Sequence, residues 1–228
     1  MENLWKKYEG LIRQIKTEHD LTDVQGGPHD FWHAAMVAQY GLMIAEDERT
    51  GELVWIAGVC HNVDTLFSLP EIQGWHLSGY MGLCGDFVSV EEKKCITVAV
   101  ENHSKLNDPA DDLVAQALKD ADRLANLGIV HALRAAQYFP KMACVDPRYV
   151  HDDSRIIFKG PNANSFRNPV SVAEHLMATL EWESMLRLPR AKKMAVALIK
   201  ERQEFLENIR RQFEETGLYP LPLELAGL

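Results

Sequence analysis

The chain has 228 residues, of which 46% are hydrophobic, and a formal net charge of −9 at neutral pH. This length suits one domain with a sizeable core, or two small domains. The acidic residues are spread along the chain instead of forming a tail. This distribution argues against a broad nucleic-acid-binding face and against attachment to an anionic membrane surface, so we expect small-molecule partners, with no nucleic-acid polymer and no membrane.

The first residues, MENLWKK, carry charge where a secretory signal would need an apolar run. No stretch approaches the roughly 20 apolar residues that span a bilayer, so we expect a cytoplasmic protein. Cysteines stand at positions 60, 84, 95 and 144 without CxxC spacing. This spacing argues against a thiolate zinc site, and we interpret all four as buried thiols.

Several segments show apolar residues at helical spacing, whereas strand-type alternation is scarce, so the predicted fold class is all-α. A first helix is expected over residues 3–19. The Gly26-Gly27 pair then breaks the chain, and Pro28 suits the first position of a second helix, which continues to about residue 48. A third helix, buried on most sides, is expected over residues 52–62 and ends in His61-Asn62.

A glycine-rich stretch follows, with glycines at positions 74, 79, 82 and 85. Ser89 and Glu92 then fit a capping box, which predicts a helix that begins there and ends near His103. Asp108, followed by proline, predicts the N-cap of another helix, which reaches at least Gly128.

Helical periodicity is lost over residues 139–169, a longer stretch than most unstructured loops. Basic residues outnumber acidic ones there, and they include Arg148 and Lys159. The segment is interpreted either as a solvated surface excursion or as a lid over an anionic substrate. Two further helices are predicted after it, over residues 170–185 and 189–215.

Two aspartates lie close together in the helix that follows Asp108. Asp122 falls beside Leu118 and Ala121 on the apolar stripe, whereas Asp120 aligns with Gln116 on the opposite side, which we expect to be solvated. A carboxylate buried without a partner costs several kcal/mol. Asp122 therefore calls for a partner, which is either a basic group, a helix N-terminus or a metal ion.

Four histidines precede Asp122 in an order that a helical metal site could use: His33, His61, His76 and His103. A divalent cation gathers nitrogen and oxygen donors from several helices, so one shared ion would account for these polar residues together. His29 and His33, one helical turn apart, form a rival local pair. The flanking apolar residues indicate that His33 points inward.

This order of residues resembles the HD-domain superfamily of metal-dependent phosphohydrolases. The matching features are His33, the His61-Asn62 pair that closes a buried helix, His103, and Asp122 within KDADRL at residues 119–124. The segments GPHDFWH (27–33), ENHS (101–104) and ERQEFL (201–206) resemble small bacterial HD hydrolases of the YedJ-like kind. The resemblance covers roughly residues 20–215. It implies one HD-type helical domain over residues 1–228, with an HD core at about 20–138, the loop at 139–169 and C-terminal helices at 170–215.

The resemblance also implies a set of metal ligands, namely His33, His61, Asn62 and Asp122. The cofactor would be a divalent ion of Mn, Co, Ni, Fe, Zn or Mg. His103, together with His76, would line the pocket and face substrate or a second metal. The His29-Asp30 pair has the same two letters as the family motif, but it begins a helix instead of closing one.

One position departs from the family pattern, because Asn62 stands where the family has aspartate. An amide oxygen brings no negative charge and bridges two cations poorly, which argues against a two-metal centre. Asp64, three residues after His61, could supply the missing carboxylate if the helix continues. Thr65 takes the place of the lysine that often follows the family motif.

The implied activity is hydrolysis of a phosphate ester in a nucleotide or another small phosphorylated metabolite, so we expect an enzyme. A bound cation would activate water, and His103 would protonate the leaving oxygen, with Asp64 as a second catalytic group. The substrate's charge would be met by Lys105, Arg123, Arg148 and Lys159, each of which could equally be an ordinary solvated side chain.

Two alternatives remain open. One is a catalytically degenerate HD-fold protein that binds a nucleotide or a protein partner, which Asn62 favours. The other is a redox enzyme with a di-iron centre, as in some HD-like folds. The sequence also leaves the oligomeric state open, with a homo-oligomer among the arrangements it allows.

Overall fold

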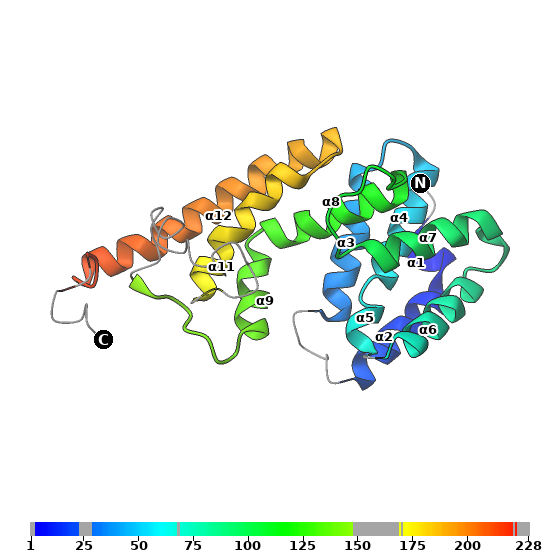
Figure 1. The fold of residues 1–228 in the computed structure, drawn as a ribbon, viewed down its shortest axis with the longest axis horizontal. Helices are drawn as coiled ribbons and strands as arrows, with labels where there is room; N and C mark the ends of the chain where they lie inside the picture. The colour runs from blue at the N-terminus through cyan, green and yellow to red at the C-terminus, as the bar shows by residue number, and fades with distance from the viewer. Residues whose placement is uncertain are drawn as a thin grey trace. The chain divides into compact units, whose positions relative to one another are not determined.

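The computed structural model describes residues 3–22, 29–67, 69–147, 169, 171–220 and 222. Within these ranges the regular elements are helices (Figure 1). One isolated parallel bridge joins Ala143 to Ser171. The all-α prediction is therefore confirmed. The chain divides into two compact units, Met1–Ala125 with Met185–Met194, and Asn126–Ser184 with Ala195–Leu228. That residues 1–228 make one domain stays a prediction.

The first unit begins with two short helices, α1 (Leu4–Lys7) and α2 (Glu9–Leu21), where the sequence predicted a single one. The break falls at Tyr8, whose backbone leaves the helical region. Tyr8 is almost completely buried, and its hydroxyl donates to Glu52 Oε1 at 2.6 Å. Tertiary contacts of this one side chain therefore override the continuous helical periodicity.

Helices α3 (Phe31–Ile44) and α4 (Glu48–Cys60) pack side by side. The structure starts α3 at the Asp30 N-cap, while the predicted first residue, Pro28, lies outside the described residues. Close approach requires glycine at position 58, since a Cβ there would lie 2.7 Å from the backbone of Ala38. This tight pair carries two of the predicted metal ligands, one at the start of α3 and one at the end of α4.

The glycine-rich stretch is mostly helical, because α5 (Val63–Leu66) is followed by α6 (Pro70–Leu83) and then by a short 3-10 helix, η1 (Gly85–Phe87). The sequence pattern predicted no helix over this stretch. Each helical glycine costs up to about 1 kcal/mol relative to alanine, but burial of Leu77, Tyr80 and Met81 anchors α6. Helix α6 packs against α2 and α5 (Figure 1).

The capping box predicted at Ser89 is present and begins α7 (Val90–Asn102). The Ser89 hydroxyl accepts from the Glu92 backbone, and the Glu92 carboxylate accepts from the Ser89 N–H at 2.8 Å. Helix α7 packs against α4 and ends with His103 as its C-cap. The structure confirms both predicted ends of this helix.

Helix α8 (Leu113–Leu127) starts later than predicted. The Asp108 carboxylate accepts from Ala110 N within a turn, and the Asp112 carboxylate accepts from Ala115 N, each at 2.8 Å. The N-cap assigned to Asp108 was therefore wrong, because a second aspartate four residues later supplies the competing start signal.

The second unit contains α9 (Val130–Tyr138), α11 (Val172–Ala178) and most of both η3 (Thr179–Met185) and α12 (Pro189–Glu215). Helices α9 and α11 pack together around a core that includes Ala135 and Leu176. The bounds predicted for the last helix are confirmed. Of the predicted loop at 139–169, Arg148 and Lys159 lie outside the described residues, so the lid stays a prediction.

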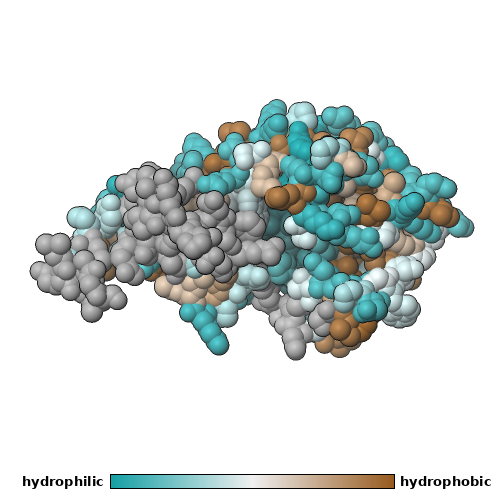
Figure 2. Space-filling view, viewed as in Figure 1, coloured by the Kyte–Doolittle hydropathy of each residue, from teal (hydrophilic) through white to brown (hydrophobic). Residues whose placement is uncertain are grey.

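The described surface offers no broad apolar face in the view of Figure 2, where hydrophobic residues are dispersed among hydrophilic ones. In the part of the chain that the structure describes, no helix has the length and apolarity needed to cross a membrane. Cys60 and Cys84 are buried as predicted, but Cys95 is half-buried and Cys144 is exposed, so the prediction of four buried thiols was wrong for two.

Candidate metal centre

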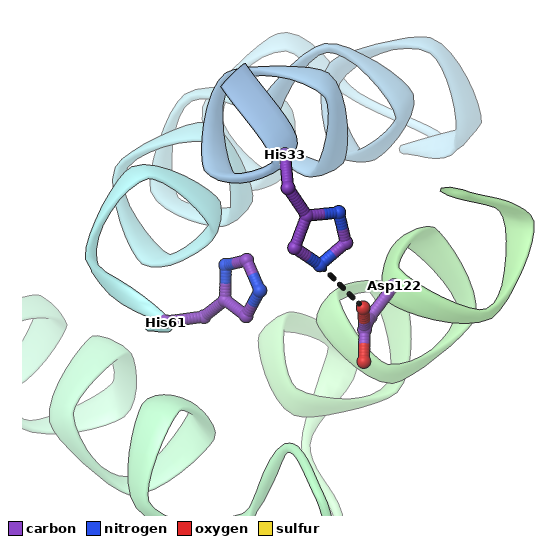
Figure 3. Close-up of side chains that lie close together, drawn as sticks. All are labelled: His33, His61 and Asp122. Atoms are coloured by element: carbon purple, nitrogen blue, oxygen red, sulfur yellow. Dashed lines mark ion pairs between the residues drawn. The ribbon is translucent and has the colours of Figure 1, made fainter. Parts of the chain in front are cut away.

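Three side chains from separate helices converge in the first unit, and all three are predicted metal ligands. His33 lies on α3, His61 closes α4 and Asp122 lies on α8, and one ligand atom of each falls within 4.8 Å of the other two. Figure 3 shows His33 pointing toward Asp122, with the ring of His61 beside it. The His33 Nε2 to Asp122 Oδ1 distance is 3.3 Å, and the two imidazole centroids are 5.0 Å apart.

His61 is held in the form that binds metals. The imidazole is 1% exposed, and its Nδ1–H donates to the Gly58 carbonyl at 2.6 Å, which leaves the Nε2 lone pair available. Burial lowers the pKa of His61 well below its usual value, and the neighbouring His33 lowers it further. A neutral imidazole oriented by a backbone carbonyl is a usual arrangement for a metal ligand.

Asp122 supplies the negative charge of the cluster. Burial raises the pKa of Asp122, but the hydrogen bond from His33 and the electrostatic influence of the neighbouring imidazoles outweigh this and hold the pKa well below its usual range. Asp122 is therefore ionised at neutral pH. Binding of a cation by His33 Nε2 would displace the proton that this nitrogen donates to Asp122.

His103 borders the cluster, at the C-cap of α7. Its ring centroid lies 5.2 Å from that of His61, and its Nδ1–H donates to the Val100 carbonyl at 2.7 Å. This hydrogen bond leaves Nε2 as the ring nitrogen that Val100 does not engage. The structure thus places His103 next to the ligands, as the sequence predicted for a pocket-lining group, and its catalytic role stays a prediction.

Asn62 is 2% exposed and follows His61 directly. Its side-chain amide donates to the carbonyl of His29 at 3.0 Å and, more weakly, to that of Asp30 at 3.4 Å. The amide nitrogen is thus engaged by the chain segment that precedes α3. The role of the Asn62 oxygen as a metal ligand stays a prediction.

Two other predicted residues lie on the first unit's surface. Asp64 is exposed on α5, and its carboxylate accepts from Thr65 Oγ1 at 3.5 Å. Lys105 is exposed beyond the end of α7, and its ammonium donates to Asn102 Oδ1 at 2.7 Å. Their catalytic and substrate-binding roles stay predictions.

His76 lies on α6 among contacts other than those of the cluster. Its Nδ1 is 3.3 Å from a Glu18 carboxylate oxygen, and its ring stacks on Phe67 at 3.8 Å between centroids. None of the contacts described for His76 is with His33, His61 or Asp122. The structure therefore accounts for His76 as a connector between α2 and α6.

Arg123 is buried, and its guanidinium donates to Asp120 at 3.4 Å and to the Met185 carbonyl at 3.1 Å. Burial lowers the pKa of Arg123, although Asp120 opposes this effect. The alternative of ordinary surface solvation was wrong for this residue. Its described contacts tie α8 to the segment before α12.

Asp120 was placed on a solvated side of the helix, and this was wrong. It is completely buried, and one carboxylate oxygen accepts from the backbone N–H groups of Arg187 and Leu188, each at 2.8 Å. Lys119 is buried too, paired with Asp111 at 2.8 Å. The sequence of α8 contains no signal for the burial of Asp120, because the partners of this residue lie at residues 187 and 188.

Comparison with known proteins gives the fold. No family model matches the chain, and no curated protein matches it. An HD-superfamily hydrolase from Bacillus thuringiensis has a TM-score of 0.66 at 18% identity, covering 93% of this chain and 99% of that one. A Lactobacillus plantarum protein also has a TM-score of 0.66 at 18% identity, covering 92% and 98%. Bacillus subtilis YpgQ, solved in complex with ADP, has a TM-score of 0.62 at 17% identity, covering 92% and 96%. The chain therefore has the fold of HD-domain proteins.

Proposed function

We propose that this protein is a divalent-metal-dependent phosphohydrolase that acts on a nucleotide or another small phosphorylated metabolite. The observation that carries the proposal is the convergence of His33, His61 and Asp122 within the first unit. Two imidazoles and one ionised carboxylate are a donor set that suits a divalent cation. The HD-superfamily hydrolase with the same fold supports the reaction class.

The donor chemistry also favours certain metals. His33 Nε2, His61 Nε2 and the Asp122 carboxylate would hold the ion. Because Mg²⁺ prefers oxygen ligands, two imidazoles among three donors favour Mn, Fe, Co, Ni or Zn over Mg. When bound, such an ion lowers the pKa of water and polarises a phosphoryl oxygen.

The remaining chemistry falls to the chain's own residues. Asp122 supplies the negative charge that faces the ion. Burial keeps His61 neutral, and the Gly58 carbonyl orients its ring by accepting from Nδ1–H. His103, whose Nδ1 is fixed by Val100, has Nε2 available to exchange a proton with the leaving oxygen. Lys105 and, outside the described residues, Arg148 and Lys159 are the basic groups proposed to contact phosphate.

Charge supports an anionic substrate. The three donors together carry one negative charge, so a bound divalent cation leaves the centre with a net positive charge. Such a centre attracts phosphate oxygens in a chain that is otherwise acidic. The ADP complex of Bacillus subtilis YpgQ supports a nucleotide as the first substrate class to test.

The test is metal-dependent hydrolysis of a substrate panel. Protein stripped with a chelator is reconstituted with each metal in turn and assayed for release of phosphate or pyrophosphate from phosphomonoesters and nucleoside mono-, di- and triphosphates. We expect turnover that requires the metal and falls on the order of 100-fold or more in His61→Ala, while His76→Gln keeps it. Absence of turnover with every metal, in protein that binds metal stoichiometrically, would reject the enzyme.

The neutral Asn62 favours a second candidate, a degenerate HD-fold protein that binds a nucleotide without hydrolysing it. This candidate predicts nucleotide binding by calorimetry together with no product formation over many hours. Turnover of the bound nucleotide would eliminate it.

A further inference from the structure

The side-chain NH2 group of Asn62, which an aspartate lacks, donates hydrogen bonds to the chain segment before α3. Its Nδ2 donates to the His29 carbonyl at 3.0 Å and to the Asp30 carbonyl at 3.4 Å. Both acceptors are distant in sequence from Asn62, so the contact is tertiary. Because Asn62 is 2% exposed, water does not replace these hydrogen bonds easily.

This contact continues to a metal ligand. Asp30 caps α3, since its carboxylate accepts from the His33 N–H at 2.9 Å and its carbonyl accepts from Ala34 N at 3.3 Å. The hydrogen bonds thus run from Asn62, beside His61, to Asp30 and on to His33. They connect the corner that bears His61 to the helix start that bears His33.

An aspartate at position 62 would reverse the chemistry of this contact. A carboxylate only accepts hydrogen bonds, so its second oxygen would face the His29 and Asp30 carbonyl oxygens at about the present amide distances. A buried charge facing two carbonyl oxygens is unfavourable unless a cation lies between them. The amide therefore fits this arrangement of two carbonyl acceptors better than the family's acid does.

The asparagine at position 62, where the family has aspartate, also limits the number of metal ions that the site can hold. Asp122 is the one carboxylate in the described cluster, and it already neutralises half the charge of a divalent cation. A second divalent ion would raise the net charge of a largely buried site to +3 with no further anion. Asp64, the other candidate acid, is exposed, and its described partner is Thr65.

We propose that Asn62 is a positioning residue that fixes the His29–Asp30 turn against the His61 corner, and that the centre holds a single divalent cation. The part about the ion rests on the proposed function, whereas the positioning role is a property of the metal-free protein. The two are therefore tested separately.

The number of ions is measured by equilibrium dialysis against Mn²⁺ up to millimolar concentration, with bound metal counted by elemental analysis. We expect one ion per chain at the plateau in the unaltered protein. Asp122→Asn should bind less than one ion per chain at the Mn²⁺ concentration that saturates the unaltered protein. Two ions per chain in the unaltered protein would overturn the single-ion centre. If the unaltered protein binds none, the proposed function fails, and the positioning role is still decided by the next experiment.

The positioning role is measured by amide hydrogen exchange of His33 and Ala34 in chelator-treated protein. These two amides donate to Asp30, so they report directly on the turn that Asn62 holds. We expect exchange about tenfold faster in Asn62→Asp and Asn62→Ala, the factor that corresponds to losing one buried hydrogen bond. Unchanged exchange in both variants would overturn the role.

Asn107→Asp is the control at an exposed position, because the Asn107 amide also donates to a backbone carbonyl, that of Met185, at 2.8 Å. It should leave the exchange of His33 and Ala34 unchanged. Asn62→Ser keeps one donor and serves if the aspartate variant does not fold. Asn62→Ser should show an intermediate exchange rate. The proposal is rejected if Asn62→Ser and Asn62→Ala both exchange at the rate of the unaltered protein.

Discussion

Asp120 and Asp122 lie two positions apart on α8, but Asp120 is bound by backbone N–H groups and Asp122 by a histidine side chain. Asp120 accepts from the backbone N–H groups of Arg187 and Leu188, while the Asp122 carboxylate lies 3.3 Å from His33 Nε2. One acid therefore fastens the segment before α12, and the other belongs to the candidate metal centre. This neighbouring pair allows folding and metal binding to be separated by single substitutions.

Asp122→Asn should weaken metal binding strongly with little change in fold. The amide keeps an oxygen that can accept from His33, but it removes the negative charge of the cluster. We expect Mn²⁺ affinity to fall on the order of 100-fold or more, while the circular dichroism spectrum of the metal-free protein is unchanged. Calorimetric titration of both proteins measures the difference. Equal affinities would show that Asp122 is not a ligand.

Asp120→Asn should destabilise the protein. Burial raises the pKa of Asp120, while the N–H groups of Leu188 and Arg187 oppose this effect by stabilising the carboxylate. An amide would weaken these charge-assisted hydrogen bonds and the contact with Arg123, at a cost of roughly 2–4 kcal/mol. Urea denaturation of metal-free protein measures the loss. The exposed Asp86→Asn is the control and should change stability by less than about 0.5 kcal/mol.

Capping residues and apolar spacing predicted the bounds of a helix correctly where no neighbouring residue offered a competing start or stop signal. The capping box at Ser89 and the long C-terminal stripe gave the bounds of α7 and α12 because the relevant hydrogen bonds and apolar spacing lie within each segment. Asp108 failed as an N-cap because Asp112 competes with it. The helical glycine-rich stretch was missed because the burial of Leu77 and Tyr80 depends on distant helices.

The candidate site was predicted from residue types more than from geometry. The residue pattern gave four histidines followed by Asp122, and the resemblance to HD-domain proteins implied His33, His61, Asn62 and Asp122 as ligands. The structure brings His33, His61 and Asp122 together. The buried roles of Asp120 and Arg123 could not be read from α8 alone, because their partners come from residues 185–188, far along the chain. Helical periodicity predicts which single face of a helix packs on the core. It does not show whether another chain segment covers the opposite face.

The stability of the metal-free protein should fall as the pH drops below about 6.5, partly because of His19. This residue is 2% exposed and its Nδ1–H donates to the Ile15 carbonyl at 2.9 Å. Burial lowers the pKa of His19, although the Ile15 hydrogen bond opposes it. In this pH range the unfolded chain therefore binds a proton that the folded chain does not, and unfolding becomes easier.

His19→Gln should flatten this dependence. Free energies of unfolding measured in urea between pH 7 and pH 5 should decline less steeply in the variant, because its side chain does not titrate. The slope per histidine is at most about 1.4 kcal/mol per pH unit. His61, whose pKa is also lowered by burial, leaves a residual slope of the same sign. Parallel curves for the two proteins would contradict the assignment to His19.

Arg202 should be a major contributor to the stability of the second unit. The side chain is completely buried, and its guanidinium donates to neutral oxygens, among them the Asn126 carbonyl at 3.0 Å and the Leu176 carbonyl at 3.2 Å. Burial lowers the pKa of Arg202 to about 10, so it stays charged at neutral pH. These hydrogen bonds join the end of α8, helix α11 and helix α12 within one unit.

Arg202→Met keeps an unbranched apolar stem but removes a charged donor from those buried carbonyl oxygens, of which the Leu176 carbonyl keeps the Thr179 hydroxyl as a donor. We expect a loss of roughly 3 kcal/mol in the free energy of unfolding, since each unsatisfied acceptor costs about 1–3 kcal/mol and the removed charge offsets part of the total. The exposed Arg211→Met, which breaks a surface ion pair with Glu215, should change stability by less than about 1 kcal/mol. Equal stability losses for Arg202→Met and Arg211→Met in urea denaturation would show that the buried guanidinium is dispensable.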